Sequence, residues 1–146
     1  MSAQHRRPWL AAILPAVILL VVLSSLAFAA QPGSGKWAGE LKTNGADLSF
    51  KVAKSGKSLK NFAVTLLPVY CTVGGLTHRV YLMPSAKVQN NGSFKRTYKT
   101  KDHGQVDGKL KLSGKFKSSN KASGNLSYVR DGCSSGPVGW SAKRKG

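Results

Sequence analysis

Apolar and polar residues alternate with a period of two through almost every segment that follows Lys36. The alternation is clearest over residues 106–117, where lysines and Asp107 occupy the positions between apolar residues and glycines. Because successive side chains of a β-strand point to opposite faces, this pattern predicts strands with one buried face. Turn residues such as Asn44 and Gly45 separate the segments at near-regular spacing. The sequence therefore predicts an all-β fold.

About eight short strands with short turns predict an antiparallel meander. We expect the sheet to close as a small barrel, with a β-sandwich as the alternative, because an open sheet would leave its edges exposed. Eight strands enclose little space beyond their own side chains, so any interior pocket should be small. The aromatic residues predicted to fill the interior are Trp37, Phe50, Phe62, Phe94, Phe116, Tyr128 and Trp140.

The first 30 residues have the composition of an export signal. Arg6 and Arg7 precede an apolar stretch over residues 10–23, and small residues follow it. We expect a signal peptide over residues 1–30, a flexible lead over 31–35 and a single all-β domain over 36–146. An uncleaved membrane anchor is the alternative, because the apolar stretch approaches the roughly 20 residues of a membrane helix. Both interpretations predict an extracytoplasmic domain, either secreted or anchored.

The chain has two cysteines, Cys71 and Cys133. In an exported protein such a pair indicates one disulfide, because oxidising compartments form and preserve these bonds. Closing so long a loop could contribute roughly 4 kcal/mol by the chain-entropy model. Two free thiols are the alternative.

The balance of charge is strongly basic, with 23 lysines and arginines against 5 acidic residues and a formal net charge of +18. Such a field attracts polyanions. Alternating lysines on three successive predicted strands should form one basic face. These are Lys95, Lys99, Lys109, Lys111, Lys115, Lys117 and Lys121.

This basic face is expected to bind anionic cell-surface polymers or membrane headgroups by salt-sensitive attraction. Sequence-specific nucleic-acid binding is not expected, because outward aromatic residues for base stacking are scarce on these strands. The alternative is a solvated surface whose lysines only keep the protein soluble.

A second candidate site is a small interior pocket. His78 and Arg96 are in phase with apolar neighbours, which predicts that they point inward. With Tyr98 and Tyr128 they would anchor an anionic or carbonyl-bearing ligand, since a buried charge is costly without a partner. The alternative places both at a rim, where Arg96 extends its charge into water and His78 bonds a backbone carbonyl.

Candidates for catalysis are few. Beyond residue 30 the acidic residues are Glu40, Asp47, Asp102, Asp107 and Asp131, and the histidines are His78 and His103. No two acids are placed as a glycoside-hydrolysing pair. Asp102, His103 and Asp107 are close in sequence but lack metal-ligand spacing, and they suit turns better. We therefore expect a non-enzymatic protein without a metal or cofactor.

Two short segments resemble known families. Gly35, Lys36 and Trp37 resemble the Gly-x-Trp opening of calycin barrels of the lipocalin and avidin type. That resemblance implies that Trp37 packs at the closed end of the barrel beneath Arg144. The ending from Cys133 to Lys143 resembles uncharacterised exported small β-barrel proteins of Gram-positive bacteria, which implies compartment and fold but no activity.

The leading functional hypothesis is a secreted binding module with a lysine-rich sheet face. A small-ligand carrier with an interior pocket is the second hypothesis, and a purely structural or inhibitor-like domain is the third.

Overall fold

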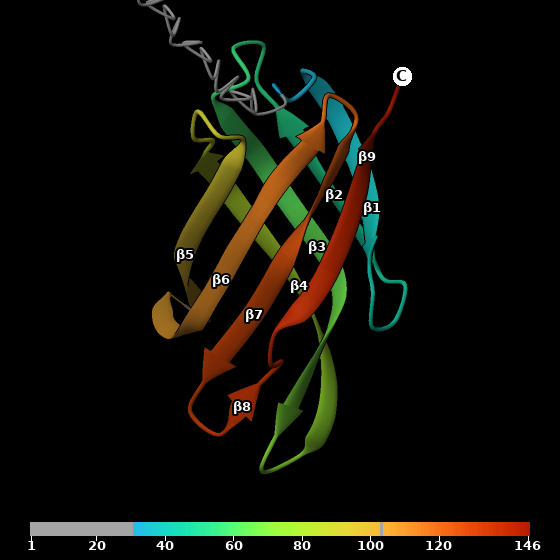
Figure 1. Ribbon diagram of the computed structural model, residues 1–146. Coiled ribbons are helices and arrows are strands. Elements are labelled where there is room, and N and C mark those ends of the chain that lie inside the picture. The colour runs from blue at the N-terminus through green and yellow to red at the C-terminus, as the bar shows by residue number, and fades with distance from the viewer. Residues whose placement is uncertain (1–30, 103) are drawn as a thin grey trace, which may run out of the picture.

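The computed structural model describes residues 31–102 and 104–146, and it describes residues 102 and 105 by their backbone alone. The predicted signal segment, residues 1–30, lies outside these. Nine strands build the described part (Figure 1). Across it, no element qualifies as a helical membrane span by length and hydropathy. The strands are β1 (Gly35–Leu41), β2 (Asp47–Val52), β3 (Ser58–Cys71), β4 (Gly75–Lys87), β5 (Ser93–Asp102), β6 (Gln105–Ser118), β7 (Lys121–Arg130), β8 (Cys133–Ser134) and β9 (Val138–Arg144).

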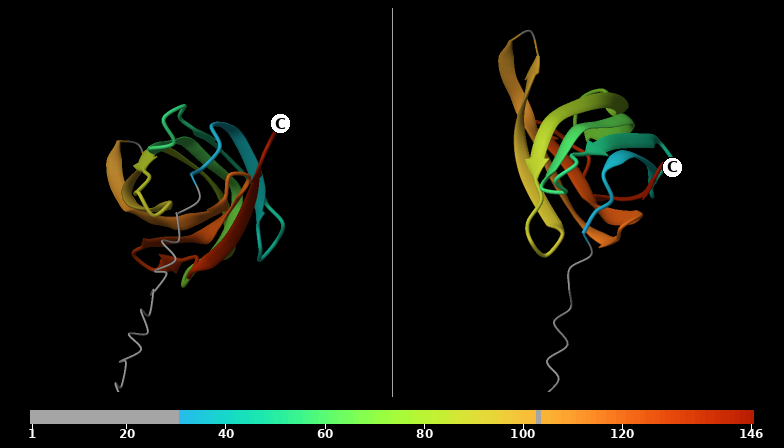
Figure 2. Two further views of the ribbon diagram at one scale, coloured as in Figure 1. Left: turned by 45° about the horizontal axis from the view of Figure 1, so that its top comes forward. Right: turned by 90° about the horizontal axis from the view of Figure 1, so that it is seen from above.

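The strands form one antiparallel sheet in the order β4-β3-β2-β1-β9-β7-β6-β5. The last strand, β9, pairs with the first, β1, so the meander curls back on itself (Figure 2). The short β8 pairs with both β3 and β7, which completes a closed ring of six strands. The remaining strands extend this ring. The predicted antiparallel barrel is therefore confirmed.

The barrel has an open seam between β4 and β5. Among the described residues, the pairing between these two segments is limited to one isolated bridge, Val88 with Phe94, beside the turn that joins them. Beyond that bridge the two strands diverge. In the right-hand view of Figure 2 the paired ends of β5 and β6 project beyond the barrel. Among the described residues, β4 and β5 thus each have one long edge without a neighbouring strand.

Aromatic rings from strands all around the barrel fill the core. The seven aromatic residues predicted for the interior are each at most 2% exposed, which confirms that prediction. Rings from opposite strands touch, as when Phe50 of β2 meets Phe116 of β6 at 6.4 Å between centroids. Trp140 of β9 contacts Phe62 and Phe94 in the same way. Because the rings occupy the middle, the core is packed solid with side chains.

A β-bulge at Leu66 reverses the side-chain alternation of β3. Leu66 has a φ of 50°, and the register moves from Val64 opposite Tyr81 to Leu67 opposite Arg79. The extra residue turns Leu66 outward, where it is 55% exposed, and Leu67 takes the buried position. Strict alternation from Val64 would bury Leu66, and the bulge prevents this.

Proline does not end β3, although proline is normally excluded from the interior of a strand. Pro68 lies inside the strand, which continues to Cys71 and pairs Pro68 with His78 of β4. The bulge just before it has already changed the register, and bulges are among the places where a strand tolerates proline.

On β4 the apolar residues Leu76, Val80 and Leu82 face outward. The inner face is set by β3, because Met83 and Tyr81 lie opposite the buried Phe62 and Val64. The inward orientation predicted for the other face is therefore wrong. That outer face carries Leu76, His78, Val80 and Leu82, all of which are exposed.

A further bulge lies on β6, where Thr100 pairs with Gly108 but Lys101 pairs with Val106. The extra residue is Asp107. Val106, predicted on the apolar face, is 57% exposed, while Asp107 turns toward the interior. The local alternation could not indicate this exchange, because it depends on the partner strand.

Candidate anion-binding surface

The seven lysines predicted as a basic face lie on the adjacent strands β5, β6 and β7. The register places β6 between β5 and β7, side by side in Figure 1. All seven side chains are exposed. The structure therefore brings the predicted residues onto neighbouring strands of one outer surface.

Cross-strand pairing arranges these lysines in rows. Lys99 lies opposite Lys109, and Lys111 lies between Thr97 of β5 and Ser127 of β7. Alternate residues on one face of a strand are about 7 Å apart, and neighbouring strands are about 4.8 Å apart. The result is an array of ammonium groups interspersed with hydroxyl side chains, a surface suited to a polymer with repeated negative charges.

The basic surface continues onto β9, which the sequence reasoning missed. Lys143 pairs directly with Lys121 across β7 and β9. A shallow hollow of about 720 Å³ opens beside them over β7, β9 and β1. Small side chains such as Ala38 and Ser141 line it. Its cationic part comes from Lys42, Lys117, Lys121, Lys143, Arg144 and Lys145. The alternation of β9 was the signal that could have placed Lys143 outward.

The acidic residues of the described part lie away from the centre of the basic surface. Glu40 and Asp47 face each other across β1 and β2, and both line the far part of the hollow. Asp107 is turned inward, and Asp131 lies in the turn after β7. The charge of the protein is thus distributed unevenly over its surface.

The predicted interior pocket does not form as expected. His78 is exposed on the outer face of β4, so its predicted inward orientation is wrong. Arg96 lies opposite the buried Leu112, yet it too is exposed, and its guanidinium stacks over the Tyr98 ring at 5.4 Å. Its position at the open edge of β5 explains this, since a side chain there reaches water past the seam.

The tyrosines of that prediction have structural partners. Tyr98 crosses the seam and donates its hydroxyl to the backbone oxygen of Ser85 in β4. Burial raises the pKa of Tyr98 above its ordinary value, although Arg96 and the bond to Ser85 act in the opposite direction. Tyr128 is fully buried and stacks against Tyr81 at 4.9 Å between ring centroids.

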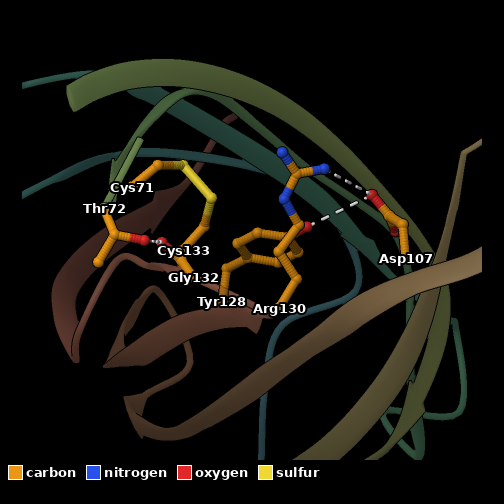
Figure 3. The surroundings of a disulfide bond; sticks show 7 residues. All are labelled: Cys71, Thr72, Asp107, Tyr128, Arg130, Gly132 and Cys133. Atoms are coloured by element: carbon orange, nitrogen blue, oxygen red, sulfur yellow. Dashed lines mark hydrogen bonds and ion pairs between the residues drawn. A yellow bond between two sulfur atoms is a disulfide. The ribbon is translucent and has the colours of Figure 1, made fainter. Parts of the chain in front are cut away.

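A polar cluster surrounds Asp107 near the disulfide (Figure 3). The Tyr128 hydroxyl donates to Asp107 Oδ2 at 3.4 Å, and Arg130 Nη1 lies 3.7 Å from the same oxygen. Burial raises the pKa of Tyr81 far above its ordinary value, and the adjacent Tyr128 hydroxyl adds to the effect. The partners of Asp107 explain how a carboxylate is accommodated at the edge of the core.

The predicted disulfide is confirmed. Cys71 at the end of β3 and Cys133 at the start of β8 are bonded and also lie opposite each other in the sheet. Thr72 and Gly132 beside them are joined by two further hydrogen bonds (Figure 3). The bond fixes the strand that closes the ring, and it is consistent with an oxidising compartment.

Trp37 and Arg144, paired by the calycin resemblance, do lie together at the ends of β1 and β9. They are register partners, Trp37 is 1% exposed, and its indole nitrogen donates to Gly33 O at 3.0 Å. Gly33 also donates its amide to Ser119 O at 2.9 Å. The segment predicted as a flexible lead is therefore held against the barrel.

The described residues hold no group of three or more metal-ligating side chains. The side chains of Asp102 and His103, considered as metal ligands in the sequence, lie outside the description. The chain matches no protein-family model, and no curated protein or solved structure is significantly similar to it. The resemblance to calycin barrels and to exported Gram-positive proteins therefore stays a prediction.

Proposed function

We propose that the chain is a secreted or extracytoplasmic binding module without catalytic activity, whose lysine-rich face holds anionic polymers or membrane headgroups. One observation carries the proposal: the lysines of β5, β6 and β7 are all exposed and lie in cross-strand rows on one outer surface. A cationic surface of this kind attracts polyanions over the Debye length and holds them by releasing their counterions.

The rest of the molecule supports this function. A disulfide-stapled barrel with a solid aromatic core presents the lysines on a rigid sheet, so few backbone degrees of freedom are lost on binding. The lysine side chains stay flexible, which suits an irregular polymer better than a ligand of one fixed shape. The disulfide and the basic, apolar, small-residue order of the first 30 residues support the compartment.

The test compares two variants of equal net charge. Lys109, Lys111 and Lys115 lie on β6 in the middle of the basic face, whereas Lys51, Lys60 and Lys87 are exposed on β2, β3 and β4. Replacing either set by glutamine removes three positive charges. The exported, disulfide-bonded chain and both variants are passed over immobilised polyphosphate, dextran sulfate and anionic lipid vesicles at several salt concentrations.

We expect the β6 variant to elute at much lower salt than the control variant. Its plot of log affinity against log salt should be less steep by about 2 to 3, because each phosphate contact contributes about 0.7 to 0.9 to the slope. Equal losses in the two variants would reduce the effect to net charge. Absence of salt-sensitive retention on all three matrices would leave the structural or inhibitor-like domain as the better hypothesis.

A further inference from the structure

The seam between β4 and β5 contains a cleft of about 430 Å³. Its walls come from the unpaired edges of the two strands, residues 79–84 on one side and 98–101 on the other, and Asp107 and Leu110 line it as well. Strand edges carry backbone donors and acceptors that seek a partner strand. The cleft is therefore bounded by exposed backbone along its length.

The two edges differ in chemistry. Lysine on an edge strand discourages pairing with other chains, and β5 carries exposed lysines at Lys95, Lys99 and Lys101. The matching segment of β4 has no lysine from Gly75 to Ala86, and Arg79 and Pro84 stand at the two ends of its cleft-lining part. Between them it exposes Val80 and Leu82 beside its free edge. With fewer charges and more exposed apolar surface, β4 is the more receptive edge, and the β5 lysines form a cationic border opposite it.

Polar atoms without partners lie at the base of the cleft. The Tyr81 hydroxyl, Thr100 Oγ1 and Asp107 Oδ1 are buried, and among the described residues they have no hydrogen-bond partner. Buried polar atoms are seldom left unpaired in a folded protein, because each costs about 1–3 kcal/mol. Tyr81, Thr100 and Asp107 all line the cleft, so a ligand with hydroxyl or amide groups would suit its polar wall.

We propose that this cleft binds an extended acidic peptide segment of a partner protein, which adds to the β4 edge as a further strand. The peptide's backbone pairs with the free edge of β4. Its side chains alternate, so every second one points outward beside Lys99 and Lys101, and the others point inward toward Tyr81, Thr100 and Asp107. The outward positions therefore suit glutamate or aspartate, and the inward positions suit threonine or serine.

A second copy of this chain is a poorer occupant. The net charge of +18 opposes the association of two copies. If the β5 edge of a second copy entered the cleft, its lysines would lie beside the β5 lysines of the first copy. An acidic strand removes that repulsion. Lys99 belongs to both surfaces, but the free edge of β4 lies outside the basic face, so peptide binding does not depend on the function proposed above.

The probe is a fluorescently labelled peptide of four Glu-Thr repeats with blocked ends. One control peptide has the same sequence with both its glutamates and its threonines N-methylated, which keeps every side chain and removes the backbone donors from both edges of the strand. A second control has the same composition with the glutamates and threonines in two separate blocks. Binding to the exported, disulfide-bonded full chain is measured by fluorescence anisotropy, and strand addition by amide hydrogen exchange.

We expect the alternating peptide to bind at least about tenfold more tightly than either control, because both backbone pairing and alternation contribute. Amides of β4 between Leu76 and Leu82 should gain protection at alternate residues. The double change Lys99→Glu and Lys101→Glu should weaken binding by at least about tenfold, whereas Lys51→Glu with Lys60→Glu should weaken it by less than about threefold, since neighbouring charges interact more strongly than distant ones.

The triple Lys109, Lys111 and Lys115 glutamine variant separates this proposal from the polymer-binding function, because it should keep peptide binding within about threefold. Equal binding of the N-methylated peptide would overturn strand addition. A stable dimer of the peptide-free chain whose formation protects the same β4 amides would overturn it in favour of a second copy.

Discussion

Gly124 provides the sharpest test of the packing inside the barrel. It lies in β7 opposite Gly114 of β6 and Trp140 of β9. A Cβ atom built on Gly124 would lie 2.0 Å from Ser113 O, 2.6 Å from Gly114 Cα and 2.7 Å from Trp140 Cζ2. Favourable contacts between carbon atoms begin at about 3.5 Å. Two of the three atoms are backbone atoms held in the ladder between β6 and β7, so no change of rotamer relieves the overlap.

We therefore expect Gly124→Ala to destabilise the fold by about 3 kcal/mol or more, at the upper end of what an added methyl costs in a packed core. Total stabilities of single domains are about 5–15 kcal/mol, so the loss is a large fraction. With a urea dependence of about 1–3 kcal/mol per molar, the unfolding midpoint should fall by at least about 1 M. The assay is urea unfolding of the exported, disulfide-bonded chain, followed by tryptophan fluorescence.

Gly139→Ala is the matched control. Gly139 precedes Trp140 on β9 and lies opposite Asn125, the residue that follows Gly124 on β7. A Cβ there would meet only side-chain atoms, the nearest being Lys42 Cδ at 3.2 Å. The flexible Lys42 side chain can move away from the added methyl group. Alanine also restricts the unfolded chain more than glycine does, which stabilises the folded state by up to about 1 kcal/mol. We expect no loss of stability. Equal unfolding midpoints for the two variants would refute the packing argument for Gly124.

Two further predictions concern the β3 bulge and the tyrosines of the seam. Asn44 Nδ2 donates to Leu66 O at 2.9 Å, so Asn44→Ala should cost about 1 kcal/mol in urea unfolding, and an unchanged midpoint would mean that this bond does not support the bulge. The raised pKa values of Tyr81 and Tyr98 keep both hydroxyls protonated in the fold, whereas the unfolded chain ionises near pH 10.0. Stability should therefore be retained below about pH 10 and fall as the pH rises further, and replacing both tyrosines by phenylalanine should flatten that decline.

Where the alternation is unbroken, the sequence was sufficient to predict the structure. In β2, for example, Leu48, Phe50 and Val52 alternate with polar residues, and all three are buried as predicted. In such a strand one face is clearly more apolar than the other, so burial can select only one register. The lysine-rich outer surface was predicted by the same argument. Lysines that alternate with buried residues along a strand lie on its other face, which must be in water.

Where both faces of a strand carry apolar residues, the prediction failed. On β4 the alternation of Leu76, Val80 and Leu82 was more visible in the sequence than the inner face formed by the buried Met83 and the partly buried Tyr81. Only the pairing with β3 determines which set is buried. The bulges were not predicted for the same reason. A residue is extra only relative to the partner strand, so the sequence of one strand does not show it. Leu66 carries no local signal for a positive φ, whereas Asn61, at φ 51°, belongs to a residue type that adopts it more readily.

Two of the departures from simple alternation lie beside the seam, and two further register shifts lie between β2 and β3 and near the turn that joins β6 to β7. The Leu66 bulge lies on the strand that pairs with β4, and the Asp107 bulge lies on the strand that pairs with β5. One changes the register beside the receptive edge, and the other turns a carboxylate into the cleft. A regular eight-stranded meander would bury Leu66 and expose Asp107, which would remove that carboxylate from beneath the seam. Local rules in a natural sequence tend to be broken at functional sites, so the two bulges beside the seam support a role for its opening.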